Sequence, residues 1–173
     1  MPWFAFLMIV LVSVAQGQLP DTIKSPDGRR IAVIRDIKAV PPWGGTESVI
    51  KILGKTGKVI FYNDHTEDGS LGHRVNPIGW TANSQFFLYT LESSGGHQFW
   101  HYNVQVYSTR MGEVVNLDDY FVYPITVDAQ VSLGSPDSVF VTVDTSAHVV
   151  EWREQSYRVS LSKLLSNKNP KIK

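Results

Sequence analysis

The feature that most constrains this chain is a short turn followed by an apolar strand, which occurs three times at nearly equal spacing. Residues 25–28 read Ser-Pro-Asp-Gly and precede the run "IAVI". Residues 81–84 read Thr-Ala-Asn-Ser and precede "FFLY", and residues 135–138 read Ser-Pro-Asp-Ser and precede "VFV". The starts lie 56 and 54 residues apart. A nearly fixed period of this length is typical of repeat architectures.

The second half of each unit follows a common plan of strand, turn and strand. "SVIKILGKTGKVIFY" places a Gly-Lys-Thr-Gly turn between two strand-like runs, and "NVQVYSTRMGEVVNL" places a turn ending in Met-Gly at the corresponding point. Short runs rich in β-branched and aromatic residues, bounded by turn formers, are typical of strands. The third copy, "VVEWREQSYRVSLSKLL", lacks the glycine turn, so this unit is degenerate or ends differently.

We therefore predict an all-β chain of three four-stranded antiparallel repeats, over about residues 22–64, 74–119 and 125–165. Helical periodicity is nearly absent, and only "SLSKLLSNK" near the C-terminus is compatible with a helical turn. In the first turn Pro26 fixes φ, and Gly28 supplies a positive φ at little steric cost. The continuous apolar runs after the turns are typical of inner strands that are covered on both faces.

The motif "SPDGRRIAV", followed by a strand and a "TGKV" hairpin, resembles a blade of the TolB-like, WD40-like β-propeller repeat. "SPDSVFVTV" and "TANSQFFLY" resemble it more loosely, and the similarity covers most of residues 22–165. The resemblance implies four-stranded antiparallel blades. It implies no active site, because functions in that family lie on variable loops.

The number of units departs from the propeller pattern. Propellers typically close a ring with about 4 to 8 blades, and three units do not close one alone. One alternative is a composite ring with another chain, for which a homodimer is the simplest candidate. The others are an open or sandwich-like β-domain and a truncated propeller.

The N-terminal stretch "MPWFAFLMIVLVSVAQGQLP" has no charged side chain and contains a dense apolar run. That run is shorter than the roughly 20 apolar residues that span a bilayer, and small residues flank Gln16 as at a cleavage site. We interpret residues 1–17 as a secretory signal peptide, with an uncleaved membrane anchor as the alternative. Cleavage before Gln18 would leave a single all-β domain, residues 18–173, exported to the periplasm or the extracellular space.

Composition narrows the chemistry and the partners. Lys plus Arg and Asp plus Glu number 16 each, and this balance argues against nucleic acids and anionic membranes, whose binding requires a basic excess. The chain has no cysteine, which excludes a disulfide scaffold, thiol chemistry and Cys-based metal sites. We expect no cofactor, and no membrane insertion after signal cleavage.

Several patterns imitate functional sites. "DHTEDG", residues 64–69, resembles the start of a calcium loop, but Val75 stands where the bidentate acid belongs. His97 and His101 lie about 13 Å apart if they share a strand, which is too far for a common metal without a bend. The nucleophile elbow, HExxH, P-loop and dinucleotide glycine patterns do not occur. We therefore predict no catalytic and no metal-binding residues.

Two loops, "VPPWGGTES" and "ESSGGHQFWHY", combine aromatic side chains with glycines. Trp43, His97, Trp100 and Tyr102 are the predicted binding residues, because exposed aromatic groups favour recognition. Packing in the core or between blades is the alternative for Trp100 and Tyr102. The favoured function is a non-catalytic exported binding module whose partner is a protein or a cell-envelope component. The alternatives are an assembly element of a composite ring and a glycan- or peptide-directed hydrolase or lyase.

Overall fold

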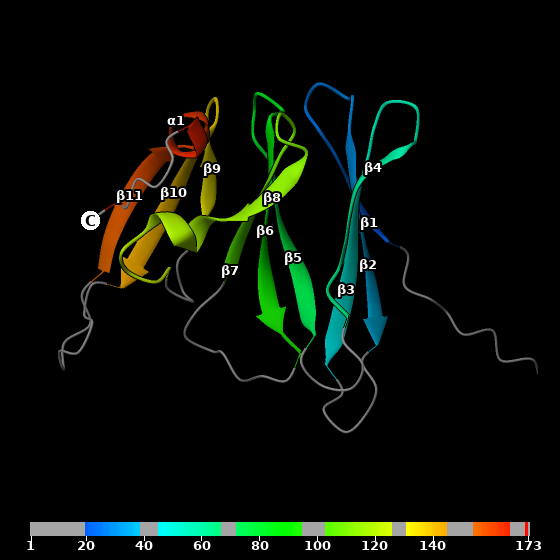
Figure 1. Ribbon diagram of the computed structural model, residues 1–173, viewed down its shortest axis with the longest axis horizontal. Helices are drawn as coiled ribbons and strands as arrows, with labels where there is room; N and C mark the ends of the chain where they lie inside the picture. Colours follow the sequence, from blue (N-terminus) through cyan, green and yellow to red (C-terminus); the bar gives the residue numbers. More distant parts are fainter. Residues whose placement is uncertain are drawn as a thin grey trace, which may run out of the picture.

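The computed structural model describes residues 20–38, 45–66, 72–94, 103–125, 131–144, 154–166 and 172. These residues form three antiparallel sheets, so the predicted all-β character is confirmed. The sheets lie side by side in chain order, with the second sheet in the middle (Figure 1).

The first two sheets are four-stranded, and in each the strands pair in chain order. The first sheet contains β1 (Asp21–Lys24), β2 (Ile31–Lys38), β3 (Thr46–Leu53) and β4 (Val59–Asp64). The second sheet contains β5 (His73–Trp80), β6 (Phe86–Ser93), β7 (Asn103–Ser108) and β8 (Glu113–Asn116). A 3-10 helix, η1 (Leu117–Tyr120), follows β8.

The third sheet has three strands in the described part of the chain, so the prediction of four is wrong here. It contains β9 (Ser132–Gly134), β10 (Ser138–Asp144) and β11 (Glu154–Ser160). β11 pairs with β10 along its whole length and runs directly into the α-helix α1 (Leu161–Ser166). Because no glycine turn follows β11, the chain does not fold back into another strand there. The helix lies where the sequence allowed a helical turn.

The middle sheet has apolar side chains on both faces. Along β6, Phe86 and Leu88 face the third sheet, whereas Phe87 and Tyr89 face the first sheet. All four side chains are at most 5% exposed. Adjacent residues of a strand point to opposite faces, so a continuous apolar run is what a strand between two sheets requires. The prediction of a doubly covered inner strand is confirmed for β6.

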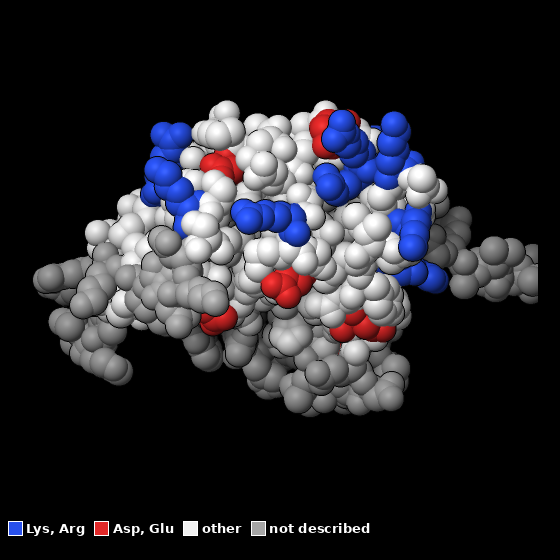
Figure 2. All heavy atoms as spheres, turned by 45° about the horizontal axis from the view of Figure 1, so that its top comes forward, with Lys and Arg blue, Asp and Glu red and all other residues white. Residues whose placement is uncertain are grey.

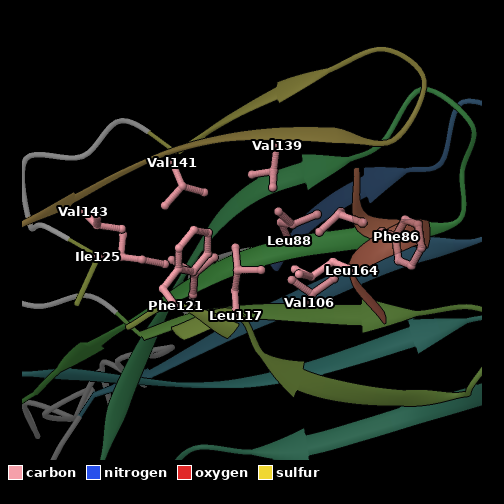
Figure 3. Packing of buried hydrophobic residues seen from close by; sticks show 12 residues of the cluster. Phe86, Leu88, Val106, Leu117, Phe121, Ile125, Val139, Val141, Val143 and Leu164 are labelled. Carbon is pink, nitrogen blue, oxygen red and sulfur yellow. The ribbon is translucent and has the colours of Figure 1, made fainter. Parts of the chain in front are cut away.

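Two apolar clusters join the sheets. The cluster between the first and second sheets is centred on Ala32, Ile34, Ile50, Ile52, Val75, Trp80, Phe87, Tyr89 and Tyr107. In the cluster between the second and third sheets, Leu88 and Val106 face Val139 and Val141 of β10 (Figure 3). Leu164 of α1 belongs to the same cluster. Burial of these apolar side chains is the main force that holds the sheets together.

The turns before β2 and β6 share one hydrogen-bonding pattern. The Ser25 hydroxyl accepts from the backbone N–H five residues further on (3.0 Å) and donates to Asp27 (2.6 Å). The Thr81 hydroxyl likewise accepts from the N–H five residues further on (3.1 Å) and donates to Asn83 (2.8 Å). Gly28 has φ +67°, as predicted for this turn. The recurring motif therefore has the same local structure in the first and second sheets.

Consecutive turns are also bonded to one another across the sheets. The Asp27 N–H donates to the Ser84 hydroxyl (3.0 Å), and the Asn83 N–H donates to the Pro136 carbonyl (3.0 Å). These bonds join turn to turn at one end of all three sheets, which we call the turn end. The opposite end, where β2, β4 and β6 finish, is called the loop end (Figure 1).

Candidate functional site

A buried glutamate organises the loop end. The Glu47 side chain, at the start of β3, is 4% exposed. Its carboxylate accepts from the Gly72 N–H (3.1 Å) and from the Ser94 hydroxyl (2.9 Å). A buried carboxylate is stable only when donors replace its lost water. Glu47 therefore fixes the segments before β5 and after β6 against the start of β3.

Two glycines permit this arrangement, because neighbouring groups lie too close to them to leave room for a Cβ atom. A Cβ atom at Gly72 would clash with the Glu47 carboxylate, and one at Gly45 would clash with the Ser94 carbonyl. The Ser94 N–H also donates to the Gly72 carbonyl (2.9 Å). The residues that flank three connections, 39–44, 67–71 and 95–102, thus meet at one place.

His65 lies beside this junction. Its backbone N–H donates to the Ser48 carbonyl (3.1 Å), and its own carbonyl accepts from the His73 N–H (2.8 Å). Its ring meets the Tyr89 ring edge-on at a centroid distance of 6.0 Å. Burial lowers the pKa of His65, the charge of His73 lowers it further, and the Asp64 carboxylate opposes the shift. The lowered pKa favours the neutral imidazole, whose Nε2 is buried and has no hydrogen-bond partner among the described residues.

A polar bridge connects the first and second sheets near the same end. The Ser48 hydroxyl donates to Asp36 (2.7 Å) and accepts from the Val75 N–H (3.0 Å). Arg74 Nε lies 3.6 Å from the Asp36 carboxylate. Ser48 is fully buried, so this bridge fixes the relative position of β3 and β5.

The four predicted binding residues, Trp43, His97, Trp100 and Tyr102, lie outside the described residues. The structure nevertheless brings together the strand ends from which their two segments leave, through the contact of Gly45 with Ser94. The sequence did not reveal Glu47, because a single glutamate in "GTESVI" carries no sign of burial.

The calcium-like segment is described only in its first part. Asp64 accepts from the Thr66 hydroxyl (2.7 Å) and the Thr66 N–H (3.0 Å), and its other oxygen accepts from the Tyr62 hydroxyl (3.0 Å). These bonds lower the pKa of Asp64, with the Thr66 hydroxyl contributing most. Asp68 and Gly69 lie outside the described residues. Among the residues that are described, no group of three His, Asp or Glu side chains is placed to hold a metal ion.

The turn end carries a hollow that sequence reasoning missed. It has a volume of about 390 Å³ and lies between α1 and the turns of the second sheet. Phe86 and Leu165 contribute apolar surface, and Arg110 contributes a cation. Exposed Arg29, Lys55 and Arg110 belong to the turns here, and Figure 2 shows Lys and Arg side chains gathered over this end.

Within the described part of the chain, no helix is long and apolar enough to cross a membrane. No protein-family model matches the chain, and no curated protein sequence does either.

Proposed function

We propose that the chain is an exported, non-catalytic binding module with blades like those of the TolB-like β-propeller repeat. It recognises a protein or a cell-envelope component through its loop end. The observation that carries this proposal is the Glu47 junction, which holds Gly72 and Ser94 in place. Binding residues are often borne on loops that a rigid scaffold positions, and the packed sheets provide that scaffold.

The amino-acid composition of the connecting segments also favours the loop end as the binding surface. Trp43 belongs to the segment before β3, and His97, Trp100 and Tyr102 belong to the segment before β7. Aromatic side chains supply much of the binding energy at protein interfaces. The polar bridge from Ser48 to Asp36 and Val75 fixes the sheets from which these segments leave.

Site-specific photocrosslinking in the source cell tests this proposal. A photoreactive residue at Trp43 or Trp100 should give a discrete adduct with one partner. The same residue at Met111, which is 42% exposed in a turn at the opposite end, is the matched control and should give no such adduct. Adducts of equal yield from both ends, or from Met111 alone, would contradict loop-end recognition.

A further inference from the structure

The outer face of the first sheet, which points away from the second sheet, carries apolar side chains and, beside them, the charged side chains of Arg35, Lys51 and Asp64. Val33, Ile37, Val49 and Tyr62 line a shallow hollow of about 320 Å³ on this face. Ile37 is 40% exposed and Tyr62 is 52% exposed. Exposed apolar patches of this kind mark interaction surfaces.

The pattern of β2 matches that of a covered strand. "IAVI" in β2 is as continuously apolar as "FFLY" in β6. In β6 both faces pack against other sheets, whereas in β2 only Ala32 and Ile34 face a neighbouring sheet. Val33, between them, lines the outer hollow. The sequence of β2 is therefore suited to a second covering layer, which the described residues of one chain do not supply.

The charges on this face are arranged symmetrically about β3. Arg35 on β2 and Asp64 on β4 both pair with Val49, so they lie in one row on either side of it. Strands are about 4.8 Å apart, which places the two charged residues roughly 10 Å from one another. No described carboxylate lies within 4.0 Å of the Arg35 guanidinium.

We propose that this face binds the same face of a second copy of the chain, about a two-fold axis that runs along β3. Such an axis places Arg35 over the second copy's Asp64, and Asp64 over the second copy's Arg35. Val49 then meets its own equivalent. In the next row, Val33 lies over the second copy's Tyr62, because both pair with Lys51 from opposite sides. Face-to-face sheets about 10 Å apart are an ordinary packing mode, and a two-fold interface must be self-complementary.

Lys51 lies on this axis, where two like charges would meet. Its ammonium, however, lies over the Tyr62 ring of its own chain, 5.5 Å from the ring centre. The cation is thus directed toward β4 and away from the axis.

The third sheet is a poorer occupant of the same surface. Its outer face presents Thr142 and Ser156, which are bonded to one another (3.1 Å), and Arg158, which covers Phe140. A composite ring of two chains would press this polar face onto the outer face of the first sheet. Desolvating these polar groups without new partners costs free energy, so the first sheet of a second copy is the better complement.

Charge exchange followed by sedimentation equilibrium tests the proposal on the purified full chain. Arg35→Asp places two carboxylates at each contact, and Asp64→Arg places two guanidinium groups there. Each variant alone should weaken dimerisation at least about tenfold, since like charges across an interface are strongly unfavourable. An equimolar mixture of the two should restore the wild-type dissociation constant within about threefold, because both contacts of the mixed dimer again join opposite charges.

Arg158→Asp is the matched control, since it makes the same substitution on the outer face of the third sheet. It should leave the dissociation constant unchanged, whereas a composite ring predicts a change. A wild-type mass of one chain across a hundredfold range of concentration would overturn the proposal. So would single variants that dimerise like the wild type, or a mixture that does not recover. Loop-end photocrosslinking in the Arg35→Asp variant distinguishes failure of this interface from failure of partner binding.

Discussion

The outer faces of the first and third sheets differ, although both sheets pack their inner faces on the same middle sheet. On the third sheet, Thr142 and Arg158 point outward, and the large apolar side chain there, Phe140, lies under the Arg158 guanidinium at 5.4 Å. On the first sheet, Val33, Ile37 and Val49 occupy outward positions beside the charged Arg35 and Asp64, and the Lys51 ammonium lies 5.5 Å from the centre of the Tyr62 ring. The third sheet thus has the alternation of a strand with one solvated face, whereas the outer face of the first sheet combines apolar with charged side chains.

The end of the chain beyond the third sheet strengthens this contrast. Leu161 and Leu164 of α1 are buried against the cluster between the second and third sheets. Asp137 accepts from the Ser162 N–H (3.0 Å) and joins the turn before β10 to the start of α1. In the third sheet, the helix α1 packs at the inner cluster and the outer face is polar. The outer face of the first sheet is better suited to further packing.

The largest effect is expected where the middle strand is covered on both sides. Phe87→Ala and Leu88→Ala should each lower the free energy of unfolding by about 3–5 kcal/mol, because each leaves a cavity in a fully buried cluster. Phe140→Ala should lower it by less than about 1 kcal/mol, since this ring lies on a solvated face. Urea denaturation measures all three. Equal losses for Phe87→Ala and Phe140→Ala would remove the distinction between covered and solvated faces.

The second-largest difference is expected between the turns of the first and third sheets, in the stability that is lost when the turn aspartate is replaced. Asp137 is 5% exposed and accepts from Ser160 and Ser162, whereas, among the described residues, the side chain of the exposed Asp27 forms hydrogen bonds only within its own turn. Asp137→Ala should cost about 1–3 kcal/mol, because it removes the hydrogen bonds that this buried carboxylate accepts. Asp27→Ala should cost less. Thermal unfolding of the two variants makes the comparison, and a larger loss for Asp27→Ala would contradict it.

Gly28→Val should destabilise the first sheet by about 1 kcal/mol or more, because a β-branched residue is strained at φ +67°. Gly28→Asn is the control, since asparagine tolerates this conformation better. Nothing lies within 4 Å of a Cβ atom there, so the effect reports backbone conformation and not crowding. Equal melting temperatures for the Val variant and the wild type would count against the turn.

The smallest effect is a pH dependence at the junction of the first and second sheets. Burial lowers the pKa of His65 in the folded chain below its ordinary value of 6.5. The unfolded chain then binds more protons, so the stabilisation is complete above about pH 6.5 and declines as the pH falls through the folded pKa. His65→Gln should flatten the dependence of unfolding free energy on pH between about 7 and 5. An identical slope in both proteins would exclude this role.

Local structure was predictable from the sequence because it depends on nearby residues. Gly28 and Gly57 adopt positive φ in the turns where the sequence placed them. The number of strands in the third sheet was predicted wrongly, because β11 continues into α1 and does not turn back into a fourth strand. Glu47 was missed because its partners, Gly72 and Ser94, are distant in sequence. The character of each outer face likewise depends on which sheets lie next to it, which strand patterns alone do not specify.

Crosslinking tests the contrast between the two outer faces most directly, because the chain has no cysteine and every introduced thiol is unique. Lys51→Cys places a thiol near the proposed axis, and Ser156→Cys places one on the exposed outer face of the third sheet. With a bismaleimide that spans about 10 Å, the separation of packed sheets, we predict that the Lys51→Cys chain forms a covalent dimer and the Ser156→Cys chain stays monomeric. A dimer from Ser156→Cys and none from Lys51→Cys would contradict the account.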